Sequence, residues 1–138
     1  MFENPDLKKR YPNAETFTFG DNRELCGRLL GLVRSGAKRA TCDDLRVFSE
    51  EAEPMPVVGG YYISLNWGGI PALVIKTTEV RIMAFKDVDE VFALAEGENS
   101  SLEGWRKGHR AYFERNLGFD PDMKLVCERF DLIEVLAT

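Results

Sequence analysis

The sequence contains few of the residues from which metal centres and disulfide frameworks are built. It has one histidine, His109, and three widely separated cysteines, Cys26, Cys42 and Cys127, with no C-x-x-C pair. A single imidazole excludes a site with several histidine ligands, and three thiols suit neither a complete disulfide framework nor a four-thiolate zinc site. We therefore expect a protein without metal or cofactor in a reducing compartment, the cytoplasm.

Signals for export and membrane insertion are also missing. The stretch MFENPDLKKRYPNAE lacks the basic start and apolar block of a signal peptide, and no apolar run approaches the length of a membrane span. The sequence shows no internal repeat, heptad run or low-complexity tract. These absences predict a soluble cytoplasmic protein without a membrane partner.

The composition fits one ordinary domain, residues 1–138. Hydrophobic residues make up 44% of the 138 positions, which is enough for a core without metal or disulfide support. The 23 Asp and Glu outnumber the 18 Lys and Arg, so the net charge is -5. This charge disfavours broad electrostatic binding to duplex nucleic acid, and a polyanionic partner must be met by a local patch. A small ligand or a short single strand fits better, and the oligomeric state stays open.

Apolar periodicity and turn residues predict the main elements. Asp21 and Glu24 have the spacing of a capping box, and Gly36 is expected to end the helix that follows. The run YYISLNWGGIPALVIKTTEVRIMAF predicts a β-hairpin that turns at residues 66–69. Helices are expected around residues 88–94 and 102–115, and KLVCERFDLIEVL predicts a final strand. This order indicates an α+β fold, with a small, strongly bent sheet or open barrel and helices at its edge.

The stretch SGAKRATCDD, residues 35–44, presents a lysine and a threonine directly after the first predicted helix. Lys38 and Thr41 would form a nucleophilic pair if burial lowered the pKa of the lysine enough for it to take the hydroxyl proton. Positions three apart on a strict strand face opposite ways, so the chain must turn between them. The alternative is a solvated lysine beside a β-forming threonine.

Two glutamates flank a glycine in the later segment AEGENSS. Glu96 or Glu98, placed in a polar break beside Gly97, would let a carboxylate face a cleft and act as a general acid or base. The same residues also resemble the start of the next helix, with Ser100 or Ser101 as its cap. The sequence leaves both interpretations open.

The helix predicted at residues 102–115 is basic on one side and aromatic on another. A cationic strip beside aromatic rings suits single-stranded nucleic acid or a nucleotide, although solubility alone also produces such helices. His109 lies on the apolar stripe, so we expect a partly buried, hydrogen-bonded imidazole rather than a catalytic base. The candidate binding residues are the cations Arg106, Lys107, Arg110 and Arg115 and the rings Trp67, Trp105 and Tyr112.

Several segments occur in the order and spacing of a known family. They are FTFGD, LVRSGAKRAT, PMPVVGGYYISL, GIPALVIKTTEV, EGENSSLEGWRKGHRAYF and DMKLVCERFDLIEV. Together they resemble the ASCH domain family, a branch of the PUA-like superfamily, over nearly the whole chain. The resemblance implies a small β-barrel-like sheet with flanking helices, and RNA or nucleoside chemistry in a cleft beside the barrel.

The resemblance also implies roles for individual residues. Some members are amidohydrolases that remove the acetyl group of N4-acetylcytidine with a K-x-x-T motif and a glutamate followed by asparagine. Here the pattern falls on Lys38, Thr41 and Glu98. Thr41 resembles the nucleophile, Lys38 the group that activates it and Glu98 the acid or base, with Arg39 as a phosphate or rim contact.

The sequence is therefore compatible with three functions. The first is a metal-independent hydrolase of a modified nucleoside. The second is a module that binds RNA or a nucleotide without chemistry, through Lys38, Arg39 and the basic helix with its aromatic and imidazole neighbours. The third is a ribonuclease, which at least one family member is described as, although one histidine and no clear two-metal carboxylate cluster leave its catalytic groups unnamed.

Overall fold

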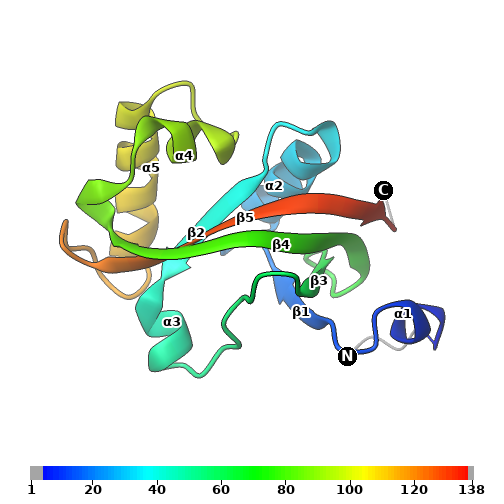
Figure 1. Ribbon diagram of the computed structural model, residues 1–138. Coiled ribbons are helices and arrows are strands. Elements are labelled where there is room, and N and C mark those ends of the chain that lie inside the picture. The colour runs from blue at the N-terminus through cyan, green and yellow to red at the C-terminus, as the bar shows by residue number, and fades with distance from the viewer. Residues whose placement is uncertain (1–4, 137–138) are drawn as a thin grey trace.

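A curved sheet of five strands forms the centre of the protein (Figure 1). The computed structural model describes residues 5–136, and the strand order is β1-β3-β4-β5-β2. Only β1 and β3 pair in parallel; the other neighbours are antiparallel. The strands are β1 (Glu15–Thr18), β2 (Ala40–Asp44), β3 (Tyr61–Leu65), β4 (Pro71–Ala84) and β5 (Lys124–Val135).

The predicted hairpin is present, and its second strand is long. β4 and β5 pair along most of their length, with register shifts between Val74 and Ile75 and between Thr77 and Glu79. Such irregularities bend the strand and increase its twist. The mixed sheet with flanking helices confirms the predicted α+β, PUA-like fold, in which the five strands curl into a half-barrel.

Helices lie at both ends of the sheet. They are α1 (Pro5–Arg10), α2 (Arg23–Ser35), α3 (Leu45–Ser49), the short 3-10 helix η1 (Phe85–Asp87), α4 (Glu90–Ala95) and α5 (Leu102–Glu114). Figure 1 shows α4 and α5 together above the left-hand part of the long strands, while α2 lies on the other side of β2.

The helix ends follow local capping chemistry, with one correction to the sequence prediction. Asn22, not Asp21, caps α2, because its side chain accepts a hydrogen bond from the Leu25 N–H. Asp21 instead pairs with Arg115, with 2.7 Å between its Oδ2 and the arginine Nε. Gly36 ends α2 in the left-handed conformation, as predicted, with φ 90°. Ser101 caps α5, which confirms the second interpretation of that segment.

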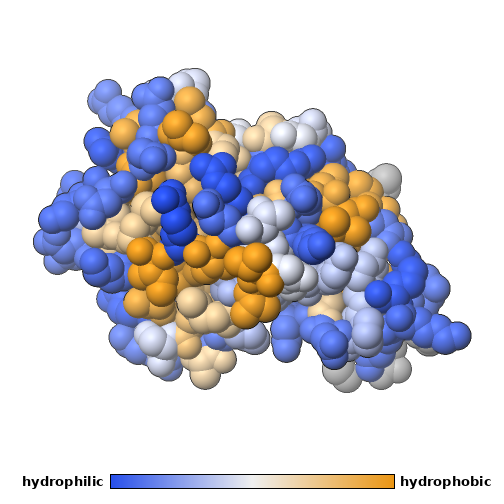
Figure 2. Space-filling view, viewed as in Figure 1, coloured by the Kyte–Doolittle hydropathy of each residue, from blue (hydrophilic) through white to orange (hydrophobic). Residues whose placement is uncertain are grey.

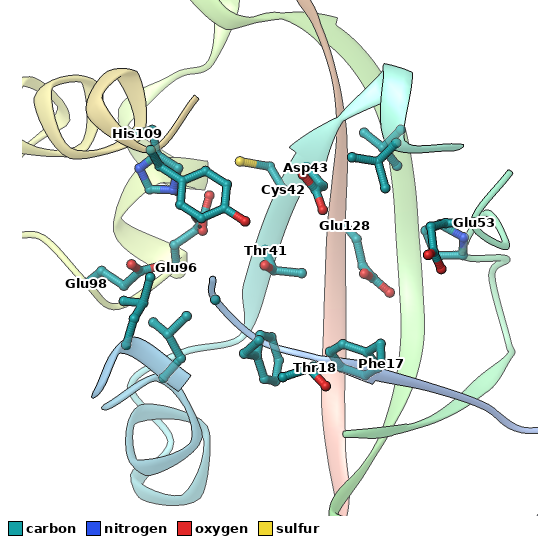
Figure 3. Close-up of a pocket in the computed structure, with 18 of the residues that line it drawn as sticks. Phe17, Thr18, Thr41, Cys42, Asp43, Glu53, Glu96, Glu98, His109 and Glu128 are labelled. Atoms are coloured by element: carbon teal, nitrogen blue, oxygen red, sulfur yellow. Dashed lines mark ion pairs between the residues drawn. The ribbon is translucent and has the colours of Figure 1, made fainter. Parts of the chain in front are cut away.

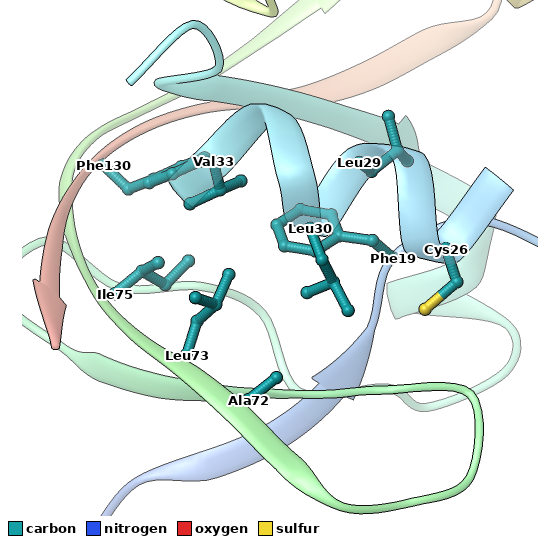
Figure 4. Packing of buried hydrophobic residues seen from close by; sticks show 9 residues of the cluster. All are labelled: Phe19, Cys26, Leu29, Leu30, Val33, Ala72, Leu73, Ile75 and Phe130. Carbon is teal, nitrogen blue, oxygen red and sulfur yellow. The ribbon is translucent and has the colours of Figure 1, made fainter. Parts of the chain in front are cut away.

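Two apolar clusters hold α2, α4 and α5 against the sheet, and a smaller third packs Leu7 of α1 against β3 and β4. One lies between α2 and the strands β4 and β5 (Figure 4) and contains Phe19, Cys26, Leu29, Leu30, Val33, Ala72, Leu73, Ile75 and Phe130. The other joins α4, α5 and η1 to β2 and β5, with Trp105 and Phe113 fully buried. Figure 2 shows that one face of the surface carries separate apolar areas divided by hydrophilic side chains. The packing leaves the space between α2 and α5 to be lined by polar groups from β2 and β5.

Candidate functional site

A cavity of about 930 Å³ opens between these two clusters (Figure 3). On one side lie the polar residues of the segment before α5 and of α5 itself: Glu96, Glu98 and His109, which we call the helical wall. Thr41 and Asp43 on β2 and Glu128 on β5 form a second side, which we call the strand wall. Phe17 and Thr18 of β1 and Glu53 of the loop before β3 complete the rim.

Lys38 is fully buried behind the helical wall. Its Nζ lies 3.2 Å from Glu96 Oε1 and 3.0 Å from Glu98 Oε2, and it also approaches the Glu96 carbonyl oxygen at 3.4 Å. The chain there is fixed by backbone hydrogen bonds from Lys38 to Leu32 and from Arg39 to Ala95. Lys38 precedes β2, which begins at Ala40, so strand alternation does not separate it from Thr41. The surface-lysine alternative is therefore wrong.

Gly97 allows the two segments to meet. Its φ is 75°, and a Cβ atom placed there would overlap the carbonyl oxygen of Ala37. Glycine alone tolerates both the left-handed conformation and this close approach of backbones. The glycine between the two glutamates therefore brings Glu96 and Glu98 onto Lys38.

The lysine is held as an ammonium ion. Burial alone would lower the pKa of Lys38, but the charges and hydrogen bonds of Glu96 and Glu98 outweigh it and raise the pKa above its ordinary value. The expectation of a lysine with a lowered pKa is therefore wrong. An ammonium beside a cavity suits stabilisation of developing negative charge better than removal of a proton.

Glu96 connects the lysine to an aromatic pair on α5. Its Oε2 accepts from Trp105 Nε1 at 2.9 Å, and its Oε1 lies 3.4 Å from His109 Nε2. Burial would raise the pKa of Glu96, but Lys38, His109 and Trp105 together lower it to about 2. The ring of His109 stacks on Trp105 with centroids 4.2 Å apart, and its Nδ1 lies 2.9 Å from the Trp105 carbonyl oxygen.

These contacts test the predicted binding roles of His109 and Trp105. His109 is a partly buried, hydrogen-bonded imidazole, as predicted, and it lines the cavity. Burial would lower its pKa, but the hydrogen bond and charge of Glu96 raise it. Trp105 is fully buried and cannot stack on a base, so that prediction is wrong. The tryptophan instead orients Glu96.

Cys42 approaches the same carboxylate from β2. One ligand atom each of Cys42, Glu96 and His109 lies within 4.8 Å of the others, a spacing at which a cation could be held. The Lys38 ammonium already lies 3.2 Å from Glu96 Oε1, and burial raises the pKa of the Cys42 thiol well above its ordinary value. A second cation would have to displace the lysine and deprotonate this thiol, so the residues fit a protonated network better than a metal centre.

On the strand wall, the pKa values of the carboxyl groups are raised, whereas that of Glu96 on the helical wall is lowered. Burial raises the pKa of Asp43 to about 6. Burial also raises the pKa of Glu128, against the lowering effect of Thr77 and Lys38. Thr77 Oγ1 donates to Glu128 Oε2 at 2.5 Å. Sequence reasoning missed both carboxyl groups; the only signal was their position within β-rich segments, where alternation puts each on one face.

Besides Trp105, five predicted binding residues do not line the cavity: Arg39, Trp67, Arg106, Lys107 and Arg110. Arg39 donates to the carbonyl oxygens of Val33 and Lys38, each at 2.8 Å, so its guanidinium completes the C-terminal end of α2 rather than a rim. Trp67 is exposed in the β3–β4 turn. Arg106 and Arg110 lie on the exposed side of α5, where Arg110 covers the Phe119 ring at 4.9 Å.

Acidic groups outnumber basic groups along the cavity lining. The cations are Arg28, His109 and Arg115, and Arg115 is already paired with Asp21. The acids are Glu15, Asp43, Glu51, Glu53, Glu96, Glu98 and Glu128. Even with Lys38 counted behind the wall, the cavity disfavours a ligand that carries several phosphates.

Comparison with known proteins assigns the family. A family model of the ASCH domain matches residues 15–134. The chain belongs to the ASCH domain family. Its structure resembles the ASCH domain of Lactobacillus crispatus JV V101, with 31% identity, a TM-score of 0.80, and coverage of 94% of this chain and 86% of that one.

Two further solved structures resemble this one. Protein EF3133 of Enterococcus faecalis V583 shows 34% identity and a TM-score of 0.82, covering 95% of this chain and 85% of that one. An ASCH protein of Zymomonas mobilis shares the fold at 10% identity, with a TM-score of 0.51, covering 90% of this chain and 71% of that one. No curated protein matches the sequence.

Membership of the ASCH family suggests an RNA-related function. Among the described helices, none is long and apolar enough to cross a membrane.

Proposed function

We propose that this ASCH domain is a metal-independent hydrolase that removes the acyl group from a modified nucleoside of the N4-acetylcytidine type. The observation that carries the proposal is the buried Lys38 ammonium, held by Glu96 and Glu98 directly behind the wall of a cavity that Thr41 lines. A buried cation held by two carboxylates is costly to build, and such groups concentrate at functional sites.

Each group has a role in the reaction. The Thr41 hydroxyl attacks the amide carbonyl carbon and forms an acyl ester. The Lys38 ammonium stabilises the oxyanion that forms on the carbonyl oxygen. Glu98, which is 14% exposed at its side chain and 3.0 Å from Lys38, relays a proton from the Lys38 ammonium to the departing amine. Water then attacks the ester and restores Thr41 and the Lys38–Glu98 pair.

The charge of the cavity supports a nucleoside over an RNA strand. Its acidic lining repels phosphate, whereas a neutral nucleoside adds no negative charge. The exposed Arg106 and Arg110 support a second candidate, a module that binds single-stranded RNA along the outer side of α5. That module would bind outside the cavity and form no product.

Turnover assays separate these functions. Purified wild type, Lys38→Ala and Thr41→Ala are incubated with N4-acetylcytidine, and cytidine release is measured by chromatography. The exposed Lys107 gives a matched control, Lys107→Ala. We expect turnover by wild type and the control and none by the two site variants, with or without a chelator. Equal turnover by wild type and Lys38→Ala would refute the mechanism, and cleavage of labelled RNA by the same preparation would favour a ribonuclease.

A further inference from the structure

The proposed mechanism leaves the proton of the attacking hydroxyl without an acceptor. Lys38 carries its full complement of protons and lies between two carboxylates. Glu96 is occupied by Lys38, Trp105 and His109, and Glu98 by Lys38. A base for Thr41 must therefore come from elsewhere on the cavity lining.

Glu128 is placed for this task by the strand register. Thr41 on β2 and Glu128 on β5 are direct partners across the antiparallel pair. The Cβ atoms of such partners lie about 4.5–5.5 Å apart, within reach of a hydrogen bond between a hydroxyl and a glutamate side chain. Both residues line the cavity, and Figure 3 shows their side chains entering it from neighbouring strands.

The carboxyl group of Glu128 is held from one side only. Thr77 Oγ1 donates to its Oε2, and none of the described residues donates a hydrogen bond to its Oε1. One oxygen therefore fixes the orientation while the other is free to accept. The titratable groups around Glu128 are Asp43 on β2, Tyr62 on β3 and Glu53 at the rim, and the charge of Lys38 acts on it from behind the helical wall.

We propose that Glu128 is the general base that takes the Thr41 hydroxyl proton, a role that rests on the proposed hydrolase function. As the proton moves to Glu128, the Thr41 oxygen bonds to the carbonyl carbon and the carbonyl π electrons move to oxygen beside Lys38. When the carbon–nitrogen bond breaks, the amine receives a proton through the Lys38–Glu98 pair. Water then gives its hydroxyl to the acyl carbon and a proton to that pair, and Glu128 returns its proton to Thr41.

Burial supports this role because it raises the pKa of Glu128 above its ordinary value, which makes the carboxylate a stronger base. A base must be deprotonated, so kcat/KM should rise with pH through the pKa of Glu128. The test measures this acid limb with N4-acetylcytidine. Glu128→Gln should lower kcat by about 100-fold or more, leave KM within a few-fold and remove the acid limb. Glu128→Asp should recover part of the activity and the limb.

Thr77→Val provides a second, gentler variant. The Thr77 hydroxyl lowers the pKa of Glu128. Its removal in Thr77→Val should therefore move the acid limb to higher pH while the protein stays folded. Asp43→Asn is the matched control, because Asp43 titrates nearby but is not opposite Thr41; the acid limb should persist in this variant. Thermal unfolding of each variant separates loss of the base from loss of the fold.

The outcomes distinguish this inference from the proposed function. If Thr41→Ala is inactive while Glu128→Gln keeps its kcat and acid limb, the role of Glu128 is wrong and the hydrolase stands. An unmoved limb in Thr77→Val also overturns the role, even if Glu128→Gln does not fold. If wild type releases no cytidine, the proposed function fails, and acetylation of Thr41 by p-nitrophenyl acetate tests Glu128 alone. Equal labelling of wild type and Glu128→Gln, or labelling of neither, overturns it.

Discussion

The helical wall and the strand wall face each other across one cavity. Both carry carboxyl groups, but the pKa of Glu96 is lowered on the helical wall, whereas the pKa values of Asp43 and Glu128 are raised on the strand wall. On the helical wall, Glu96 is charged because Lys38 and His109 surround it, and its pKa falls to about 2. On the strand wall, none of the described cations contacts Asp43 or Glu128, and burial raises the pKa of both. Environments that drive the pKa values of nearby acids apart assign them to different tasks.

The two walls also differ in how firmly their side chains are held in place. The helical wall is tied together by an ion pair, an indole hydrogen bond and a stacked imidazole, so its charges are pre-organised. The strand wall relies on single hydrogen bonds to Thr77 and to the backbone of Asp44. We therefore expect changes to the helical wall to cost more stability than changes to the strand wall.

The largest expected effect comes from removing the cation of the helical wall. Lys38→Met leaves Glu96 and Glu98 without their buried partner, which should reduce the free energy of unfolding by about 3–5 kcal/mol. Urea denaturation measures this change. The double variant Lys38→Met, Glu96→Gln should recover part of the loss; a loss below 1 kcal/mol, on the order of an exposed pair, would contradict the account.

The second effect tests how the helical wall is assembled. Gly97→Ala places a Cβ against the Ala37 carbonyl at a φ of 75°, and we expect a loss of about 2–4 kcal/mol. Gly31→Ala is the control, because a Cβ there meets nothing within 4 Å and the residue lies in α2. The control should gain about 0.5–1 kcal/mol by chemical denaturation. Similar values for both variants would show that the close approach is unimportant.

A smaller, pH-dependent effect is expected on the strand wall. The pKa of Asp43 is raised to about 6 in the folded protein, so ionisation above that pH costs folding free energy that protonation at low pH does not. Asp43→Asn should therefore stabilise the protein at pH 8, by up to about 3 kcal/mol, and have no such effect near pH 3. Thermal unfolding across this range measures the difference, and a pH-independent gain would count against the raised pKa.

The smallest effect lies outside both walls. Arg110 is exposed, and its pair with Glu114 spans 3.4 Å on the surface of α5. Arg110→Ala should change stability by less than about 0.5 kcal/mol and leave nucleoside turnover intact. If it instead weakened RNA binding in a salt-dependent assay while turnover was undetectable, the binding module would replace the hydrolase.

The sequence predicted the elements better than the partners of individual side chains. The hairpin, the final strand and α5 follow from local patterns of apolar and turn residues, which act within a few positions. Lys38 meets Glu96 and Glu98 because Gly97 lets two distant backbones touch, and no local pattern contains that contact. The aromatic side chain of Trp105 suits base stacking, yet tertiary packing buries it completely. The position of Glu128 opposite Thr41 depends on the strand register, which the sequence alone does not give.

The central claim is that Thr41 attacks an acyl amide beside the Lys38 ammonium. Its most direct test is the rate of cytidine release from N4-acetylcytidine by Thr41→Val, which keeps the shape of the side chain and removes the hydroxyl. We expect steady release by wild type, an acetyl group recovered on the Thr41 peptide by mass spectrometry, and no release by Thr41→Val. Release by Thr41→Val at the wild-type rate would contradict this claim.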